Sequence, residues 1–375
     1  MTLIACTVKN EIPFMISDLL FSNMIGRENM QVPTNNFSIN KFYPENLVYK
    51  PMDLMQKIYI LKKNLCLVLG GFKNEMTDLL IEFRKYTNEI EEANISEDEV
   101  VTFLKSYDFK NRFQKSSFGL LFIDFISETI RAAKLLTSAD WDLTQAEIFG
   151  DIHVWGSGTE TFLKVITHPG TFKSAFEEDN VLTIFQKNTC LIAQILAREK
   201  VTLQTLLEGW GGGFETVYYN KDSLEKADDI AYIINHGEFD GVDIGIPKPK
   251  VILYHKYIND VLYITALEIY RHETYVIDND IIMVADVGNY SANLHIVPSI
   301  ETSKEINKLP TDFSFETIKI AMGYFIIGKE NIPYYPAYFT HHSEITVKFE
   351  YDKRIEIIVK KDFNDEINTA AKMNM

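Results

Sequence analysis

The chain has 375 residues, of which 46% are hydrophobic and 24% are charged, a composition that excludes a disordered or fibrous protein. Because a single hydrophobic core usually stops growing at about 250 residues, two domains are expected. The formal net charge of −16 argues against a general nucleic-acid binder and against binding to acidic membranes, since both need clustered Lys and Arg.

The first part of the sequence predicts a hairpin at the extreme N-terminus and then a long irregular segment. Residues 2–8 and 12–20 are mostly apolar and flank a short polar stretch at 9–11, a pattern typical of two strands joined by a tight turn. Prolines and asparagines over residues 23–54 predict a long loop or insertion. Long loops in compact domains are often functional.

A second hairpin is expected over residues 57–60 and 65–69, and it ends at the pair Gly70-Gly71. Apolar residues then recur at helical spacing over residues 75–86. The sequence therefore predicts a change from strand to helix at the glycine pair.

The middle of the sequence contains both helical and strand patterns. Ser96 followed three residues later by Glu99 is the pattern of a capping box, so a helix is expected over residues 97–106. Buried strands are expected over residues 118–125, 151–155 and 214–219, and a helix is expected over residues 181–198.

The C-terminal third is predicted to be mostly antiparallel β-structure. Residues 251–258 and 261–269 flank Asn259-Asp260, which is the pattern of a hairpin. Residues 345–351 and 354–359 flank Asp352-Lys353 in the same way. The tail from Asp362 onward is polar enough that we expect it to fray.

The cysteines and the start of the sequence favour a reducing compartment. The three cysteines each lie in an apolar run, so buried free thiols are expected rather than disulfides or a thiolate metal site: Cys6, Cys66 and Cys190. The start of the chain lacks a basic leader, and Asp18 interrupts the early apolar stretch, which argues against a secretory signal. No segment offers the roughly twenty apolar residues of a membrane span, so we expect a cytoplasmic protein.

A chain whose first retained residue is threonine can supply the nucleophile and the base of an amide hydrolase from one residue. Once Met1 is removed, the α-amine of Thr2 would titrate at about pH 8 and would accept the proton of its own hydroxyl. A lysine beside the amine would keep the amine's pKa low, and a carboxylate would hold the lysine in place. Lys57 and Asp18 are the candidates for these two roles.

The same residues resemble the catalytic pattern of the proteasome β-subunit family of N-terminal-nucleophile hydrolases, over about residues 2–235. In that family a threonine opens the first strand, an aspartate follows sixteen residues later, and a lysine begins the third strand. Thr2, Asp18 and Lys57 match this pattern. The resemblance implies that Thr2 is the nucleophile, that Lys57 tunes its amine, and that Asp18 orients Lys57.

Further elements resemble the same family. The glycine pair at 70–71 is similar to the family's oxyanion-hole element, which implies that the amide of Gly71 stabilises the oxyanion. Ser157, in the Gly-Ser-Gly turn at 156–158, resembles the serine that lies near the N-terminal amine. Glu208 stands where the family has an aspartate that orients this serine.

The resemblance implies an α+β fold, namely a four-layer αββα sandwich of proteasome-like type with a β-rich C-terminal extension. The sandwich domain would span residues 1–235, with the insertion at about 23–54, and the extension would span residues 236–375. It also implies peptide or protein substrates and a homo-oligomer such as a ring. The sequence identifies no ATP-dependent partner.

Departures from the family pattern leave a second interpretation open. Glu208 replaces an aspartate, Gly211 replaces a serine, and the basic residue that the family has shortly after the aspartate is absent, since Leu20 and Phe21 are apolar. One extra methylene can move a carboxylate by about 1 Å, which costs on the order of a hundredfold in rate. The alternative is a catalytically inactive assembly or regulatory subunit that binds partners through its C-terminal extension. A small-molecule amidase is a third interpretation.

No cofactor and no metal are expected. The glycine run at 211–213 precedes a strand and lacks the Lys-Ser/Thr of a phosphate-binding loop. The histidines show no His-Glu-x-x-His or comparable ligand spacing.

Overall fold

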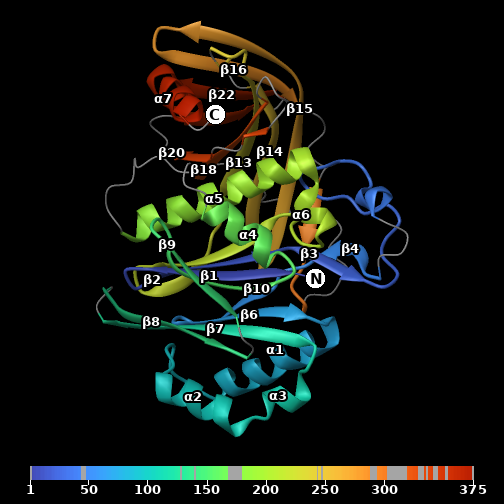
Figure 1. Cartoon of the computed structure of the whole chain (residues 1–375). Coiled ribbons are helices and arrows are strands. Elements are labelled where there is room, and N and C mark those ends of the chain that lie inside the picture. Colours follow the sequence, from blue (N-terminus) through green and yellow to red (C-terminus); the bar gives the residue numbers. More distant parts are fainter. Residues whose placement is uncertain are drawn as a thin grey trace.

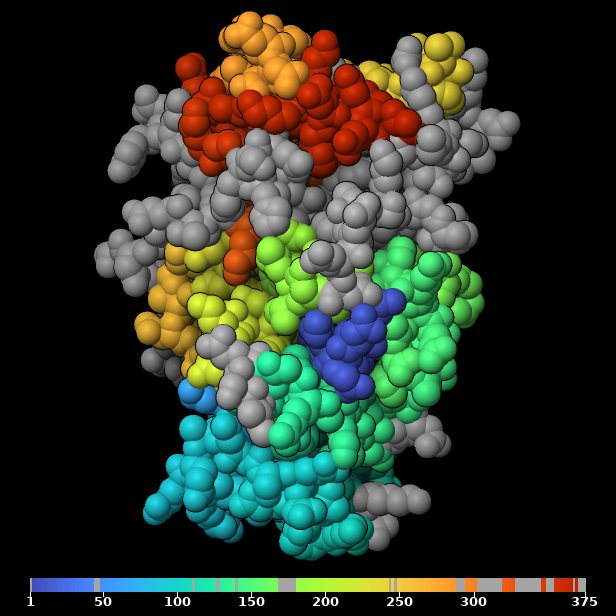
Figure 2. All heavy atoms as spheres, turned by 90° about the vertical axis from the view of Figure 1, so that its left-hand side faces the viewer, coloured from blue at the N-terminus to red at the C-terminus, as the bar shows by residue number. Residues whose placement is uncertain are grey.

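The computed structural model describes residues 2–43, 48–126, 129–138, 141–167, 180–242, 244–245, 248–287, 294–301, 319–327, 333–334, 337–340, 345–350 and 354–373. The fold is mostly β, with 51% strands and 25% helix. Figure 1 shows the sheets stacked along the long direction of the molecule. Figure 2 shows the helices of the first half (cyan) at one end, the C-terminal residues (red) at the other, and the N-terminal strands (blue) reaching the surface between them.

A six-stranded sheet contains the N-terminal hairpin. Its order is β12-β11-β2-β1-β10-β9, with β1 at Leu3–Lys9, β2 at Ile12–Asp18, β9 at Asp142–Ala146, β10 at Gly150–Gly156, β11 at Phe214–Asn220 and β12 at Ser223–Lys226. Asn10 and Glu11 join β1 to β2 with φ angles of 49° and 61°, the signature of a type I′ turn. Because successive strand residues point to opposite faces, Leu3 and Ile4 enter different hydrophobic clusters.

A four-stranded antiparallel sheet faces one side of the six-stranded sheet. Its order is β5-β6-β7-β8, with β5 at Ile58–Lys62, β6 at Leu65–Gly71, β7 at Ser116–Ile126 and β8 at Thr129–Thr137. Ile4 and Cys6 of β1 pack against Cys66 and Val68 of β6 in the cluster between the two sheets. These two sheets carry the residues of the candidate site.

Three helices cover the outer face of the four-stranded sheet (Figure 1). They are α1 at Lys73–Asn88, α2 at Glu97–Ser106 and α3 at Phe109–Arg112. Leu67 of β6 and Phe83 of α1 belong to the cluster that joins them to the sheet. The predicted capping box is confirmed, since the Ser96 side chain accepts the Glu99 N–H and the Glu99 carboxylate accepts the Ser96 N–H.

Helices also cover the opposite face of the six-stranded sheet. They are α4 at Thr159–Ile166, α5 at Val181–Thr202 and α6 at Gln204–Leu207. Helix α5 is buried along most of its length, and one cluster contains Ile16 of β2, Ile192 of α5 and Ile264 of the C-terminal sheet. Figure 1 accordingly shows α5 between two sheets, so the C-terminal strands share a core with the N-terminal half.

The C-terminal strands form one ten-stranded sheet. They are β13 at Ile230–Glu238, β14 at Lys248–Ile258, β15 at Val261–Ile277, β16 at Asp280–Val287, β17 at Leu294–Val297, β18 at Lys319–Ile327, β19 at Pro333–Tyr334, β20 at Ala337–Thr340, β21 at Ile345–Glu350 and β22 at Arg354–Lys360. The sheet curls into a half-barrel around its own cluster, in which Ile252 of β14 meets Met283 of β16. Strands β13 and β18 pair in parallel, and the other pairs are antiparallel.

The hairpin predictions for this part hold where the structure describes the residues. Asn259 and Asp260 join β14 to β15 with φ angles of 49° and 61°. Strands β21 and β22 pair as predicted, and their turn at Asp352-Lys353 lies outside the described residues. The prediction that the tail frays is wrong, because α7 spans Lys361–Met373 and its Phe363 packs against the half-barrel cluster.

The segment at 23–54 is less irregular than the sequence predicts. Strand β3 at Leu20–Asn23 pairs with β4 at Lys50–Leu54, and a short 3-10 helix spans Ile39–Phe42. Met30 and Val32 are buried in the cluster that also contains α5. Part of the described segment therefore packs into the core.

The expected four-layer αββα sandwich with a separate β-rich extension is wrong as a description of this fold. About twice as many residues lie in strands as in helices, and the strands form several antiparallel sheets and a curled half-barrel. The physical reason is the burial of α5, since the C-terminal sheet covers the face that a four-layer sandwich would leave to solvent. The proposed domain boundary after residue 235 falls within β13, and independent folding of the two parts stays a prediction.

Candidate active site

Thr2, Asp18 and Lys57 meet at one end of the two facing sheets. Thr2 precedes β1, Asp18 ends β2, and Lys57 precedes β5 of the other sheet. The Thr2 hydroxyl donates to Asp18 Oδ1 at 2.8 Å. The Lys57 ammonium donates to Thr2 Oγ1 at 2.7 Å and to Asp18 Oδ1 at 2.6 Å. All three residues are buried, each at most 3% exposed.

The register of the N-terminal hairpin brings Asp18 to the start of β1. Because Ile4 pairs with Ser17, Asp18 lies beside Leu3, whose N–H donates to Asp18 Oδ1 at 2.8 Å. The Gly211 N–H donates to the other carboxylate oxygen at 3.0 Å. A carboxylate that has lost its hydration needs such donors, and here two backbone amides supply them.

Lys57 is fixed at both its side chain and its backbone. Burial lowers the pKa of its ammonium, and the nearby carboxylates of Asp18 and Glu215 partly offset this effect. The ammonium also donates to the Leu20 carbonyl at 3.0 Å. Glu215 accepts the backbone N–H groups of Lys57 and, at 2.8 Å, of Ile58.

Ser157 lies at the backbone nitrogen of Thr2. The Thr2 N–H donates to Ser157 Oγ at 3.2 Å, and the Ser157 hydroxyl donates to the Thr2 carbonyl at 3.3 Å. Strand β10 pairs with β1 so that Gly156 lies opposite Leu3, and Ser157 follows directly. The serine is therefore next to the atom that becomes an α-amine when the bond before Thr2 is cleaved.

Thr2 lines a cavity of about 380 Å³. Gly71, Asp142, Trp155, Gly156, Ser157 and Thr159 line it as well. Gly71 has a φ of +123°, and a Cβ at this position would lie 2.4 Å from the Lys115 carbonyl oxygen, so only glycine fits. The cavity thus brings the predicted oxyanion residue and the predicted nucleophile to one space.

Glu208 is not brought into this cluster. Among the described residues, its carboxylate accepts from the Thr161 hydroxyl at 2.9 Å, the Gln204 amide at 2.7 Å and the Trp210 indole at 2.9 Å. These contacts tie α4 to α6 and to the start of the glycine run. The carboxylate has a structural role here, and its predicted support of Ser157 has no counterpart among these hydrogen bonds.

Gly211 belongs to the site, although in the sequence it was notable only as a departure from the family pattern. Its φ is +103°, and a Cβ there would lie 2.0 Å from Glu199 Oε2. Glu199 is buried in α5, where it accepts the Gly212 N–H at 3.0 Å, and burial raises its pKa. The glycine run therefore turns two successive amides toward two buried carboxylates, of Asp18 and Glu199. A run of glycines is the sequence signal for such backbone donors.

The sequence pattern did not point to Glu215. Its side chain is completely buried in β11, and it pairs with Lys226 at 3.2 Å in addition to holding the backbone at Lys57. The signal that would have found it is an acidic residue within an apolar strand pattern, since a buried carboxylate must have partners.

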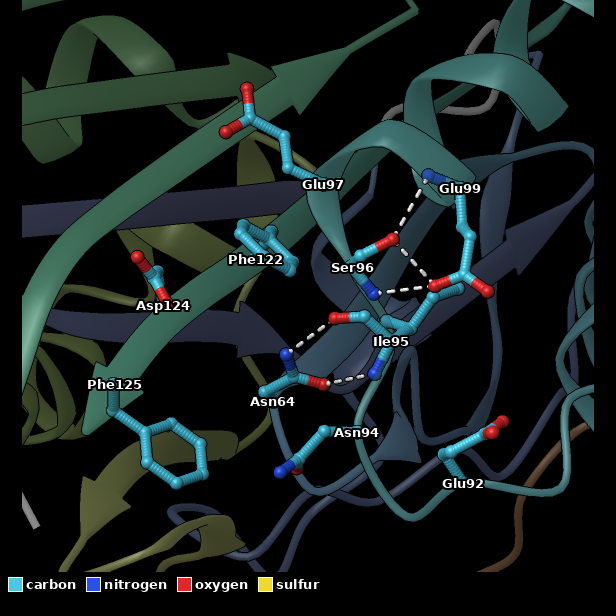
Figure 3. Close-up of a pocket in the computed structure, with 10 residues that line it drawn as sticks. All are labelled: Asn64, Glu92, Asn94, Ile95, Ser96, Glu97, Glu99, Phe122, Asp124 and Phe125. Carbon is cyan, nitrogen blue, oxygen red and sulfur yellow. Dashed lines mark hydrogen bonds between the residues drawn. The ribbon is translucent and has the colours of Figure 1, made fainter. Parts of the chain in front are cut away.

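Figure 3 shows a separate, acidic cavity of about 580 Å³. It lies at the opposite end of β6 from Thr2. Asn64 lines it just before β6 begins, whereas Gly71 ends β6, about 20 Å along the strand. Two of its four carboxylates have structural partners, because Glu99 caps α2 and Glu97 pairs with Lys134 at 2.6 Å. No residue of the candidate site lines this cavity.

Among the described residues, no cluster of three or more His, Cys, Asp or Glu side chains could hold a metal ion. No helix in the same part of the chain is long and apolar enough to cross a bilayer. Comparison with models of known protein families gave no match, and comparison with curated proteins gave none either. A function for this chain is therefore inferred from the geometry of the candidate site.

Proposed function

We propose that the protein is a threonine-type amide hydrolase that acts on peptides or proteins, with Thr2 as the nucleophile after cleavage of the bond between Met1 and Thr2. The observation that carries the proposal is the 2.7 Å hydrogen bond from the buried Lys57 ammonium to the Thr2 hydroxyl. A lysine is costly to bury, and one held against a hydroxyl and a carboxylate is typical of a perturbed functional group.

The steps follow from the residues around Thr2. Its Oγ1 attacks the carbonyl carbon of an amide, and its hydroxyl proton passes to its own neutral α-amine. The C–N bond of the substrate breaks, the proton goes to the leaving amine, and an ester to Thr2 remains until water hydrolyses it. Lys57 keeps the pKa of the α-amine low by like-charge repulsion, and Asp18 holds Lys57. Ser157 orients the amine, and Gly71 is the proposed oxyanion donor.

The test is covalent labelling by a β-lactone or an epoxyketone, read by intact mass on protein whose N-terminal residue has been determined. The expected result is one adduct on a chain that begins at Thr2 and none on the Thr2→Ala variant. Thr159→Ala is the matched control, because Thr159 lines the same cavity but donates to the Gly156 carbonyl at 2.8 Å. An unlabelled chain that begins at Thr2 would contradict the proposal.

The second candidate function, a non-catalytic assembly or regulatory subunit, is favoured by one surface. The hairpin of β15 and β16 exposes three consecutive large side chains, since Tyr275, Val276 and Ile277 are 46%, 56% and 55% exposed. Exposed apolar side chains that are close together are typical of interaction sites. Retention of Met1 in cells together with a homo-oligomer in light scattering would favour this function, because Met1 blocks the amine that the hydrolase needs.

A further inference from the structure

A second cavity, of about 430 Å³, adjoins the cavity of Thr2. Gly71 and Trp155 line both, so a ligand bound at Thr2 that extends past Gly71 enters the second cavity. Phe21 of β3, Tyr49 and Phe72 supply aromatic walls. The shared lining makes this cavity the neighbouring part of the same substrate site.

The only charged residues among the described lining of this second cavity are Lys73 and Lys115. The Lys115 ammonium lies 5.2 Å from the centre of the Phe72 ring, and the Lys73 ammonium lies 6.0 Å from that of Phe21. Aromatic faces hold an ammonium in place without neutralising its charge. Glu75 accepts the backbone N–H of Lys115 at 2.9 Å, and neither ammonium is paired with a carboxylate in the described part of the chain.

The described lining of this second cavity contains no carboxylate, whereas Asp142 lines the Thr2 cavity. The Ser22 hydroxyl, which is buried and without a hydrogen-bond partner in the described structure, lines the same cavity. Each of these groups can donate to an anionic oxygen.

We propose that this cavity binds an acidic side chain of the substrate, so that the preferred substrates are peptides with Asp or Glu at, or next to, the residue whose carbonyl Thr2 attacks. The inference rests on the proposed hydrolase function for the identity of the reacting bond. Lys73 and Lys115 are the specificity-determining residues. They bind the carboxylate, and the aromatic walls contact its methylene groups.

The test measures binding separately from cleavage. Two fluorescent peptides that differ only by Glu or Gln at the central residue are titrated against the full-length Thr2→Ala variant, which cannot form the ester. We expect the Glu peptide to bind at least tenfold more tightly at low salt, and the preference to disappear in the background Lys73→Gln/Lys115→Gln. Lys85→Gln is the matched control, because it removes one exposed lysine from the same helix without touching the cavity.

Each outcome bears on one claim. Equal binding of the two peptides, no binding of the Glu peptide, or an unchanged preference in the double variant would overturn the acidic specificity. Charge reversal by Lys73→Glu/Lys115→Glu should transfer the preference to a Lys peptide, which a merely structural role of the lysines would not produce. If the lactone labels Thr2 but the peptides show no acidic preference, the hydrolase function is supported and the specificity is wrong. If the acidic preference is found but Thr2 is not labelled, the hydrolase function is wrong and the binding of acidic side chains is supported.

Discussion

The buried pair of Lys57 and Asp18 makes a quantitative prediction about stability. Replacing Lys57 by Met leaves the Asp18 carboxylate buried with three neutral donors, namely the Thr2 hydroxyl and the N–H groups of Leu3 and Gly211. Breaking a buried ion pair costs about 3–5 kcal/mol, and the remaining donors place Lys57→Met near the lower end, at about 3 kcal/mol. Asp18→Asn leaves an unpaired buried ammonium and should cost a similar amount.

The double variant Lys57→Met/Asp18→Asn removes both charges of this pair. Its free energy of unfolding should therefore fall by about 3 kcal/mol, rather than by the roughly 6 kcal/mol that the two single losses add up to. The difference is a coupling free energy of about 3 kcal/mol. The assay is urea unfolding of all four proteins, with the free energy of unfolding as the readout.

The matched control is the pair of Lys134 and Glu97, which has the same 2.6 Å separation but side chains that are 47% and 41% exposed. Because solvent screens an exposed pair, its coupling should be below about 1 kcal/mol. Additivity of the two single losses at Lys57 and Asp18 to within about 0.5 kcal/mol would refute the buried pair and, with it, the positioning of the lysine against Thr2.

Three further predictions concern other parts of the fold. Gly211→Ala should lower the free energy of unfolding by about 2–4 kcal/mol, because the φ of Gly211 is +103° and an added Cβ would lie 2.0 Å from Glu199. Gly245→Ala is the control, since an added Cβ there has nothing within 4 Å. It should change the free energy of unfolding by less than about 0.5 kcal/mol in the same urea assay. Burial lowers the pKa of His255 to about 3, so below the ordinary value of 6.5 the unfolded chain binds a proton that the folded chain does not. The free energy of unfolding should thus fall by about 1.2 kcal/mol from pH 6 to pH 5, and this contribution should be absent from His255→Leu. An identical slope in the variant would contradict the prediction. Burial raises the pKa of all three free thiols, so iodoacetamide should not modify the native protein. After unfolding, the mass should increase by three adducts. Modification of the native chain would contradict the burial of the thiols.

Local patterns in the sequence were sufficient for several elements of the N-terminal half. The hairpin turn at Asn10 and Glu11, the end of β6 at Gly71 and the capping box at Ser96 each depend on a few neighbouring residues. Because Thr2 and Asp18 lie on one hairpin, their contact follows from a local register.

Long-range packing decided what the sequence pattern left open. Glu208 matches its expected position in the chain, yet its partners come from α4 and α6. Glu215, which holds the backbone at Lys57, lies more than a hundred residues away in the chain and could be assigned only by the pairing of sheets.

The sequence by itself determined that Thr2, Asp18 and Lys57 lie at the ends of strands, because hairpins and caps are specified by short-range residue preferences. The tertiary structure decided that the C-terminal sheet covers α5 and curls into a half-barrel, and that Lys73 and Lys115 line a cavity beside Gly71. The physical reason is that apolar periodicity tells which face of an element is buried but not which other element buries it.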